Sequence, residues 1–385
     1  MLDQPPLQLN DDFRYALDAL EKTPSSLFIT GKAGTGKSTL LQLFRNTTKK
    51  KCAVLAPTGV AALNVQGQTI HSFFGFPPRI ITPSEAGQKI TRKDLLRMYK
   101  NLEVLIIDEI SMVRADMLDG IDKFLRVNRE NFRPFGGVQV VFFGDLFQLP
   151  PVVTRDPVES AYFQDYYESP YFFSAKIFNE PDFQLEMLEL RKVYRQESRH
   201  FLRLLEAVRV NEIDHDDLED LNERHLPHFS ETDGYITLCS RNNTADSINR
   251  RELSLLETPE FEFLAEVKGQ FDPKLYPTEA ALSLKKNAQV MFVRNDLEER
   301  QFVNGTIGKI IELGKEKIIV QTEEHGGKKR KIEVPKSEWE IIRYKGSAAG
   351  GIETETVGSF IQYPLKLAWA ITIHKSQGKT FDRVL

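Results

Sequence analysis

Residues 26–40 read SLFITGKAGTGKSTL, in which a short apolar strand leads through a glycine-rich loop into a second apolar segment. The part from Gly31 to Ser38 has the spacing GxxxxGK[ST], which between a strand and a helix is typical of a phosphate-binding loop. Glycine lets backbone N–H groups approach phosphate oxygens, and a helix N-terminus favours an anion. Lys37 is expected to reach the β- and γ-phosphates, and Ser38 to offer its hydroxyl to magnesium. The predicted nucleotide-binding residues are Gly31, Ala33, Gly34, Thr35, Gly36, Lys37, Ser38 and Thr39.

The surrounding sequence alternates short apolar strands with amphipathic helices. Strands are predicted around residues 53–57 (AVLAP), 103–108 (EVLIID) and 138–145 (VQVVFFGD), and helices are predicted to start at Gly36 and Thr58. Asn10 suits a helix N-cap, and the apolar residues after it recur at helical spacing. This alternation predicts an α/β fold built on a parallel sheet with crossover helices.

Two carboxylates follow one of these strands. Asp108 and Glu109 come directly after the apolar run 104–107, so they are expected at the carboxyl edge of a buried strand. There Asp108 would hold magnesium, and Glu109 would orient or deprotonate the attacking water. The alternative is that both acids merely end a strand. With the phosphate-binding loop earlier in the chain, they predict a nucleoside triphosphatase.

Composition limits the remaining possibilities. At 385 residues, the chain is long enough for two or three domains of roughly 150 residues each. The 51 basic and 55 acidic residues give a net charge of -4, so any nucleic-acid site must be a local groove. Cys52 and Cys239 lie in separate apolar runs, which predicts reduced thiols and a cytoplasmic location. No stretch has the length of a membrane span.

The second half of the chain predicts another α/β unit with an insertion. Its pattern begins near Phe183 and resumes at about residue 348. Between them, residues 295–347 contain short β-rich pieces separated by Gly-containing turns such as Asn304-Gly305. The predicted domains are therefore 1–182, then 183–294 together with 348–385, with a small β-barrel at 295–347 inserted in the second.

The run GDLFQLPP, residues 144–151, follows the strand at 138–143. Gln148 at the edge of the sheet can contact the γ-phosphate. Here the sequence resembles the superfamily 1B DNA helicases of the petite integration frequency (PIF) type, relatives of the RecD helicases. GKAGTGKST, APTGVAAL, TIHSFFG, IIDEISMV, PFGGVQVVFFGDLFQLPP, YRQ and AWAITIHKSQGKTFD occur in that family's order from about residue 9 onward. The resemblance implies two RecA-like domains and an SH3-like inserted barrel.

The resemblance also implies roles for individual residues. It implies that Arg195 approaches the γ-phosphate across a cleft between the two α/β domains. It also implies that Gln377 and Gly378 bind the nucleotide and help to couple it to DNA. With Lys37, Asp108, Glu109 and Gln148, Arg195 completes the predicted catalytic set, while Ser38 and Asp108 are the predicted metal ligands. The predicted DNA-binding residues are Pro57, Thr58, Gly59, His71, Ser72, Phe73, Thr237, Ser240, Arg241, Asn242, Thr372, His374, Lys375 and Ser376.

Several of these residues also have a purely structural interpretation. Phe74, next to Phe73, is as well explained by burial, because most of the 26 phenylalanines must be buried. Asn242 alone suits an ordinary N-cap, and Arg195 an ordinary salt bridge.

Two departures from the family pattern are visible. The residues after Leu9-Asn10 are Asp11, Asp12 and Phe13, which differ from the family's usual pattern for an adenine-reading glutamine. The sequence stops at Leu385, where a new apolar strand is expected to begin, before the family's second cleft arginine, so a truncated chain is expected.

These observations predict an ATP- and magnesium-dependent helicase that translocates on single-stranded DNA. By resemblance, movement is 5′-to-3′, and the partners include junctions, G-quadruplexes or RNA–DNA hybrids. The expected chain is a monomer, associated with the nucleoid if bacterial, with family roles in DNA repair, recombination and telomere maintenance. The alternative is a nucleotide-responsive, single-stranded DNA-binding fragment without productive helicase activity.

Overall fold

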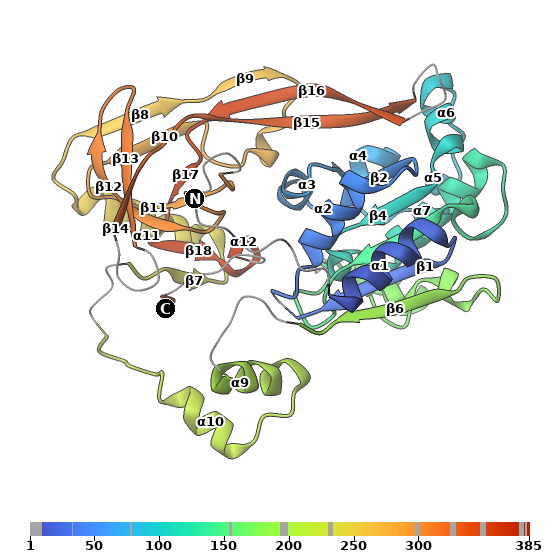
Figure 1. Cartoon of the computed structure of the whole chain (residues 1–385), viewed down its shortest axis with the longest axis horizontal. Coiled ribbons are helices and arrows are strands. Elements are labelled where there is room, and N and C mark those ends of the chain that lie inside the picture. The colour runs from blue at the N-terminus through green and yellow to red at the C-terminus, as the bar shows by residue number, and fades with distance from the viewer. Residues whose placement is uncertain are drawn as a thin grey trace. The chain divides into compact units, whose positions relative to one another are not determined.

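The computed structural model describes residues 10–32, 34–77, 79–153, 156–192, 199–229, 234–296, 301–323, 329–346, 352–376, 381 and 383–385. The chain divides into two compact units, and each is described by itself (Figure 1). The first contains residues 1–222 and 342–356, and the second contains residues 223–341 and 357–385. None of the described helices has the length and apolar character that a bilayer crossing requires.

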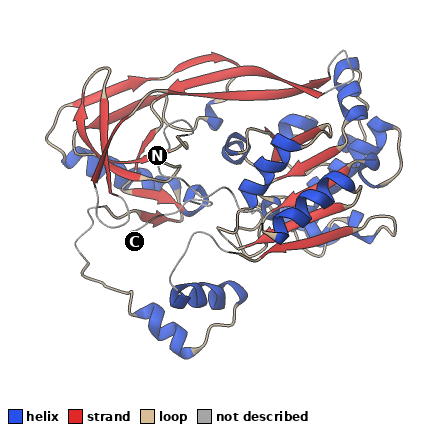
Figure 2. Ribbon diagram, in the orientation of Figure 1, coloured by secondary structure: helices blue, strands red, loops and turns tan. Residues whose placement is uncertain are grey.

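The first unit is built on a six-stranded sheet in the order β3-β2-β4-β5-β1-β6, with every neighbouring pair parallel. Figure 2 shows strands in red and helices in blue. The predicted parallel α/β fold is confirmed here. The strands are β1 (Ser26–Gly31), β2 (Cys52–Ala56), β3 (Gln68–Thr69), β4 (Val104–Ile107), β5 (Gln139–Phe143) and β6 (Leu185–Leu190).

Successive side chains of the central strands enter two different hydrophobic clusters. In β4, Val104 and Ile106 belong to the cluster under α1 (Asp11–Lys22) and α2 (Lys37–Thr47). Leu105 and Ile107 belong to the opposite cluster, under α4 (Ile70–Phe74), α6 (Lys93–Asn101) and α7 (Ala115–Arg129). Because both faces are buried, these strands read as continuous apolar runs rather than alternating ones.

Local capping explains where several helices begin. Asn10 Oδ1 accepts a hydrogen bond from Phe13 N at 2.8 Å, so the predicted N-cap of α1 is confirmed. Thr58 caps α3 (Gly59–Asn64) in the same way. The other helical segments of the first unit are α5 (Pro83–Ala86), α8 (Pro157–Tyr166), α9 (Arg199–Val210), α10 (His215–Asn222), and the 3₁₀ turns Ile110–Met112, Pro134–Gly137, Phe172–Ser174 and Lys176–Asn179.

The second α/β pattern was predicted to begin near Phe183, which includes the apolar run EMLEL at residues 186–190, and the structure gives this run a different place. It forms β6, which pairs in parallel with β1 over six register positions from Ser26↔Leu185 to Gly31↔Leu190. Periodicity identifies such a strand but does not reveal its partner, because pairing between distant segments is decided by packing.

The second unit contains an antiparallel sheet in the order β14-β13-β12-β11-β17 and a short parallel pair of β18 with β7. Strands β12, β13 and β14 fall inside the predicted insertion, whereas β11 and β17 flank it. The bounds are β7 (Thr237–Cys239), β8 (Glu260–Leu264), β9 (Glu266–Gly269), β10 (Ala281–Lys285), β11 (Gln289–Phe292), β12 (Ile307–Leu313), β13 (Ile318–Glu323), β14 (Lys329–Glu333), β15 (Ser337–Gly346), β16 (Ile352–Gln362), β17 (Leu365–Leu367), β18 (Ala370–Thr372), α11 (Asn242–Leu255), α12 (Ile373–Ser376) and the 3₁₀ turn Pro273–Leu275.

Residues 342–356, at one end of β15 and β16, belong to the first unit and carry Tyr344 into its core. The Tyr344 hydroxyl accepts a hydrogen bond from Val54 N at 3.0 Å, and Tyr344 N donates to Gln68 Oε1 at 3.2 Å. Strand β3 begins opposite Leu55, so it does not reach Val54. Tyr344 therefore satisfies a buried N–H group that the short edge strand leaves without a ladder partner.

We expect Tyr344→Phe to destabilise the chain by about 1–3 kcal/mol, because the ring is retained while a buried N–H group loses its acceptor. Urea unfolding followed by circular dichroism measures the difference. The matched control is Tyr15→Phe. Tyr15 is 51% exposed, so loss of its hydroxyl should leave the unfolding midpoint nearly unchanged. Equal midpoints for Tyr344→Phe and the parent chain would contradict this role of the hydroxyl.

Candidate active site

The predicted phosphate-binding loop joins the carboxyl end of β1 to the start of α2. Gly36 is the N-cap of α2 and has φ 92°, a backbone region that glycine adopts without strain. A Cβ at Gly36 would also lie 2.8 Å from Phe13 Cζ, so the position has no room for a side chain. Lys37 Nζ turns back into the loop and donates to the carbonyl oxygens of Gly31 at 2.5 Å and Lys32 at 3.2 Å.

Strand β4, two positions away from β1 in the sheet, ends next to the acidic pair. Asp108 N donates to Leu55 O of β2 at 2.9 Å, which fixes the backbone at the sheet edge. Desolvation raises the pKa of the Asp108 carboxyl to about 6, although Glu109 N–H and the Lys37 ammonium oppose the shift. Glu109 has φ 51°, an unusual conformation for a residue with a side chain and one that often marks functional sites.

Strand β5 lies between β4 and β1 and delivers the loop GDLFQ. Asp145 is 3% exposed, and its carboxylate accepts hydrogen bonds from Phe147 N at 3.1 Å and Gln148 Nε2 at 3.2 Å. Gln148 is thus held by an aspartate of its own loop. The sequence motif contained Asp145, but its role as the anchor of Gln148 was missed.

The charges of these three loops influence one another. Burial lowers the pKa of Lys37, while the carboxylates of Asp145, Glu109 and Asp108 act in the opposite direction. The three strand ends therefore bring one ammonium and three carboxylates into one electrostatic cluster. Ser38 and Thr39 are exposed in the first turn of α2, so their hydroxyls are accessible to a ligand at this edge.

The candidate DNA-binding residues of the first unit lie after the carboxyl end of β2 and on helix α4. Pro57 and Thr58 follow β2, and the Thr58 side chain accepts from Ala61 N at 3.2 Å. Ser72 is exposed on α4, and its Oγ accepts a hydrogen bond from Gln68 Nε2 at 2.8 Å. His71 is partly buried, and its pKa is lowered by desolvation and by Arg114.

Phe73, one of the predicted DNA-binding residues, is 4% exposed and therefore not accessible for base stacking. Its ring packs edge-on against Phe74, Tyr99 and Tyr344 with centroid separations of 4.8, 5.3 and 5.7 Å. No ring face is available to a base in this conformation. Phe73 is therefore a core residue here, and Phe74, also 4% exposed, belongs to the same core as its structural interpretation predicted.

In the second unit, two distant runs of candidate residues meet at the carboxyl ends of β7 and β18. The parallel register pairs Thr237 with Ala370 and Cys239 with Thr372. Thr372 Oγ1 donates to Asn242 Oδ1 at 3.5 Å, and Ser240, Arg241 and Lys375 are exposed nearby in sequence. His374 lies in α12 and Ser376 ends it. The remaining DNA-binding candidate among the described residues is Gly59, which begins α3 in the first unit.

The predicted Arg195, Ala33, Gln377 and Gly378 lie outside the described residues. For these residues the sequence-based roles stay predictions.

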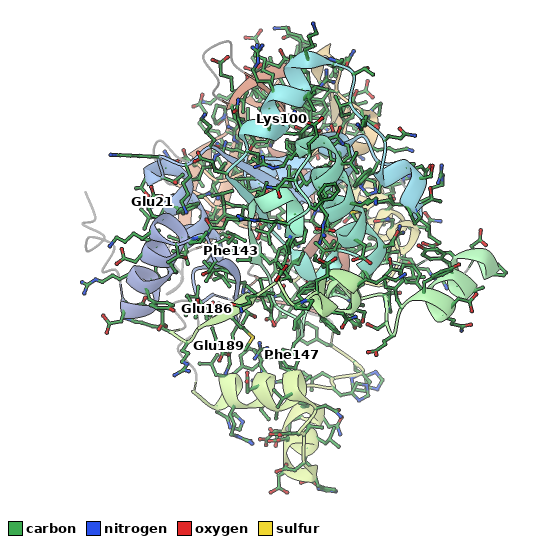
Figure 3. All side chains as sticks on the ribbon, turned by 90° about the vertical axis from the view of Figure 1, so that its right-hand side faces the viewer. Glu21, Lys100, Phe143, Phe147, Glu186 and Glu189 are labelled. Carbon is green, nitrogen blue, oxygen red and sulfur yellow. The ribbon has the colours of Figure 1, made fainter. Side chains whose placement is uncertain are left out.

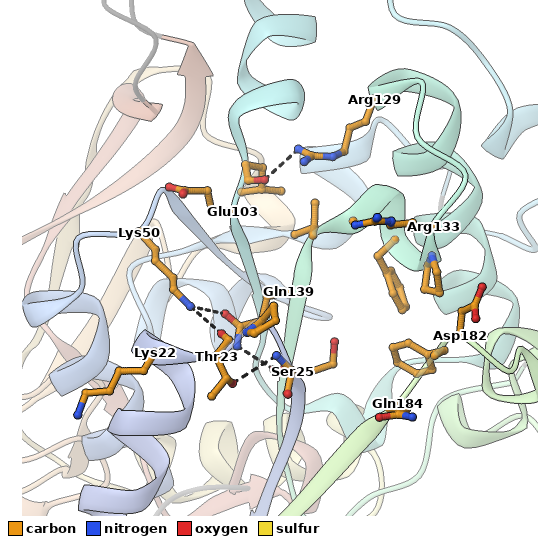
Figure 4. A pocket seen from close by; sticks show the side chains of 18 of the residues that line it. Lys22, Thr23, Ser25, Lys50, Glu103, Arg129, Arg133, Gln139, Asp182 and Gln184 are labelled. Carbon is orange, nitrogen blue, oxygen red and sulfur yellow. Dashed lines mark hydrogen bonds between the residues drawn. The ribbon is translucent and has the colours of Figure 1, made fainter.

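A cavity of about 830 Å³ lies at the opposite, amino edge of the same sheet (Figure 4). The Lys50 ammonium is the central cation there, and it donates to Leu20 O, Thr23 O and Gln139 Oε1 at 2.5, 3.0 and 2.8 Å. Arg129 is likewise bound to backbone carbonyls of Gly136 and Leu102. These cations serve the fold, and ligands of open parallel sheets bind at the carboxyl edge instead.

The raised pKa of Asp108 predicts a pH-dependent gain in stability from Asp108→Asn. The pKa of Asp108 in the folded state exceeds its value in the unfolded state, so ionised Asp108 destabilises the fold above about pH 6. This destabilisation decreases as the pH falls toward 4. The amide retains an acceptor for Glu109 N–H. In metal-free buffer at pH 8, Asp108→Asn should therefore stabilise the chain by up to about 3 kcal/mol, and by less at pH 5.

Urea unfolding at the two pH values measures this difference. Asp18→Asn is the matched control, because Asp18 is exposed on α1 in an ion pair with Lys22. A gain for Asp108→Asn that is equal at pH 5 and pH 8 would contradict the assignment.

Comparison with known proteins identifies the arrangement. The family model of PIF1-like helicases matches residues 8–219. The ATP-dependent DNA helicase Pif1 of Bdellovibrio bacteriovorus is 32% identical over 98% of this chain and 81% of its own length. The chain spans 54% of the length of PIF1 from Danio rerio and 56% of the length of PIF1 from Homo sapiens, to which it is 34% and 33% identical.

Two solved structures agree with this result. Pif1 from a Bacteroides species in complex with ADP-AlF4 has a TM-score of 0.89 and 36% identity, covering 98% of this chain and 86% of that chain. Bacteroides Pif1 bound to single-stranded DNA has a TM-score of 0.65 and 36% identity over the same shares. With the family match covering more than half of the sequence, the chain belongs to the PIF1-like helicases, a family of ATP-dependent DNA helicases.

Proposed function

We propose that this chain hydrolyses ATP and uses the free energy to translocate on single-stranded DNA and to unwind duplex or structured DNA. The observation that carries the proposal is the convergence of Lys37, Asp108, Glu109 and Asp145, delivered by three adjacent strands to one sheet edge. A lysine at the start of a helix, next to carboxylates, is the arrangement that phosphoryl transfer requires.

Each residue has a role that its chemistry supports. Lys37 would bind the β- and γ-phosphates, Glu109 would orient or deprotonate the attacking water, and Gln148 would contact the γ-phosphate. The Ser38 hydroxyl and the Asp108 carboxylate are hard oxygen donors that fit Mg²⁺. The raised pKa of Asp108 reflects a carboxylate whose charge is incompletely offset, and a bound cation would offset it. When bound, Mg²⁺ neutralises charge that develops on the phosphates.

DNA contacts would come from residues 57–59, His71 and Ser72 in the first unit, and from the β7 and β18 ends in the second. The exposed Ser72, Arg241 and Lys375 offer hydroxyl and cationic groups that suit phosphate oxygens. The structure of the Bacteroides relative bound to single-stranded DNA supports this class of ligand.

Finer features of the proposal follow the family resemblance. The second unit would be RecA-like with an SH3-like barrel around β12 to β14, and Arg195, Gln377 and Gly378 would take part in the ATP cycle. Movement would be 5′-to-3′ on junctions, G-quadruplexes or RNA–DNA hybrids, by a monomer associated with bacterial DNA. Ala33 and Thr39 would complete the phosphate loop.

Lys37→Ala should lower ATP hydrolysis roughly 100-fold or more, because the phosphates lose a pre-positioned cation. Affinity for a single-stranded oligonucleotide should be unchanged. Steady-state phosphate release with and without the oligonucleotide, together with fluorescence anisotropy of labelled DNA, measures both quantities.

Lys22→Ala is the control for this experiment, since Lys22 is exposed in the last turn of α1 and pairs with Asp18. Normal turnover in Lys37→Ala would refute the assigned site. Tight DNA binding without any turnover in the parent chain would leave only a nucleotide-responsive DNA-binding protein.

Unwinding should require a single-stranded 5′ tail and be absent with a 3′ tail, because translocation in one direction reaches the duplex only from that side. Strand displacement of a fluorescent duplex carrying either tail tests this polarity. Unwinding that starts only from 3′ tails would overturn the proposed direction without affecting the assigned ATP site.

A further inference from the structure

Helix α9 contacts both loops that are proposed to hold the phosphates. Glu206 forms an ion pair with Lys32 of the phosphate-binding loop at 2.8 Å, and Arg209 forms one with Asp145 of the GDLFQ loop at 3.0 Å. The two residues are three positions apart, so they lie on the same face of the helix. They also contact each other, with 3.3 Å between Arg209 Nη1 and Glu206 Oε1. A chain of alternating charges thus links the two loops through α9.

Asp145 is the buried centre of this network. Its Oδ1 accepts from Arg209 Nη2 and Phe147 N, while its Oδ2 accepts from Gln148 Nε2. A buried carboxylate is costly unless a cation and hydrogen bonds offset its desolvation. Removing the Arg209 charge would therefore take away the ion-pair partner of Asp145 and favour rotation of its carboxylate, which would disturb the hydrogen bond to Gln148.

The Arg209 side chain is itself held in place. Its guanidinium carbon lies 4.3 Å from the centroid of the Phe147 ring, a cation–π geometry. Figure 3 shows Phe147 on the side of the first unit where α9 lies. Arg209 Nε is buried and has no hydrogen-bond partner among the described residues. The Phe147 ring thus helps to hold the guanidinium in the position where it pairs with Asp145.

We propose that Arg209 is a positioning residue for ATP hydrolysis: through Asp145 it holds the Gln148 amide in the place where the γ-phosphate is bound. The inference deepens the proposed function and rests on the role of Gln148 given there. On this proposal, ATP hydrolysis at the full rate requires that α9 contacts the two loops.

The test compares Arg209→Gln with Arg209→Lys in the full chain. Arg209→Gln should lower kcat roughly 10- to 100-fold, because small displacements of a positioned group have effects of this size. The Kd of ADP, which has no γ-phosphate, should not change. Arg209→Lys keeps a cation for Asp145 and should recover at least part of kcat. Loss of ADP affinity together with kcat would instead show a general disruption of the loops and overturn the proposal.

Arg203→Gln is the matched control, since Arg203 lies on α9 and pairs with Asp217 and Asp220 of α10 rather than with the loops. Its kcat should equal that of the parent chain. A kcat loss as large as that of Arg209→Gln would mean that any ion pair of α9 matters, and would overturn the specific role of Arg209.

A double-mutant cycle with Gln148→Ala separates this inference from the proposed function. If Arg209 acts through Gln148, the double variant should be no slower than Gln148→Ala alone. Additive losses would overturn the proposal in favour of a direct role of Arg209. If Gln148→Ala hydrolyses ATP normally, the proposed function of Gln148 fails. If only Gln148→Ala is impaired, the inference about Arg209 fails by itself.

Discussion

Burial of both faces of the parallel sheet is the constraint on which the rest of the first unit depends. Leu105 and Ile107 enter one hydrophobic cluster, while Val104 and Ile106 enter the other. A shift of one residue would exchange the two sets, so β4 is held in register from both sides. The same alternation operates in β1 and β5. Packing on both faces of the sheet therefore fixes the carboxyl ends of these strands, from which the loops follow.

The loops at these strand ends concentrate charge where water is partly excluded. Burial lowers the pKa of Lys37 and raises the pKa of Asp108, so each charged form is less favourable here than in water. Their mutual attraction offsets only part of that effect. A ligand that brings both phosphate oxygens and a cation would complete the compensation, because it supplies partners of each sign. These electrostatics are the physical basis of our proposal that the site binds a metal-bound nucleotide.

Aromatic residues illustrate how packing and recognition compete for the same side chains. The segment HSFF supplies the exposed Ser72 and the partly buried His71, but Phe73 and Phe74 are in the core. Tyr344 contributes to that core from a segment far along the chain, and its backbone N–H binds the same Gln68 side chain that contacts Ser72. The position of this candidate DNA-binding turn is therefore supported by aromatic packing and by one glutamine.

Local chemistry was readable from the sequence alone. The loop Gly31–Ser38, the acidic pair after β4 and the Asn10 cap each depend on neighbours within a few residues, so spacing and residue type were sufficient to predict them. Tertiary structure alone decided that EMLEL pairs with β1, that Phe73 is buried, that Tyr344 satisfies Val54, and that Arg209 holds Asp145. These contacts join segments up to hundreds of residues apart, and they form because buried backbone groups and charges need partners that sequence periodicity does not identify.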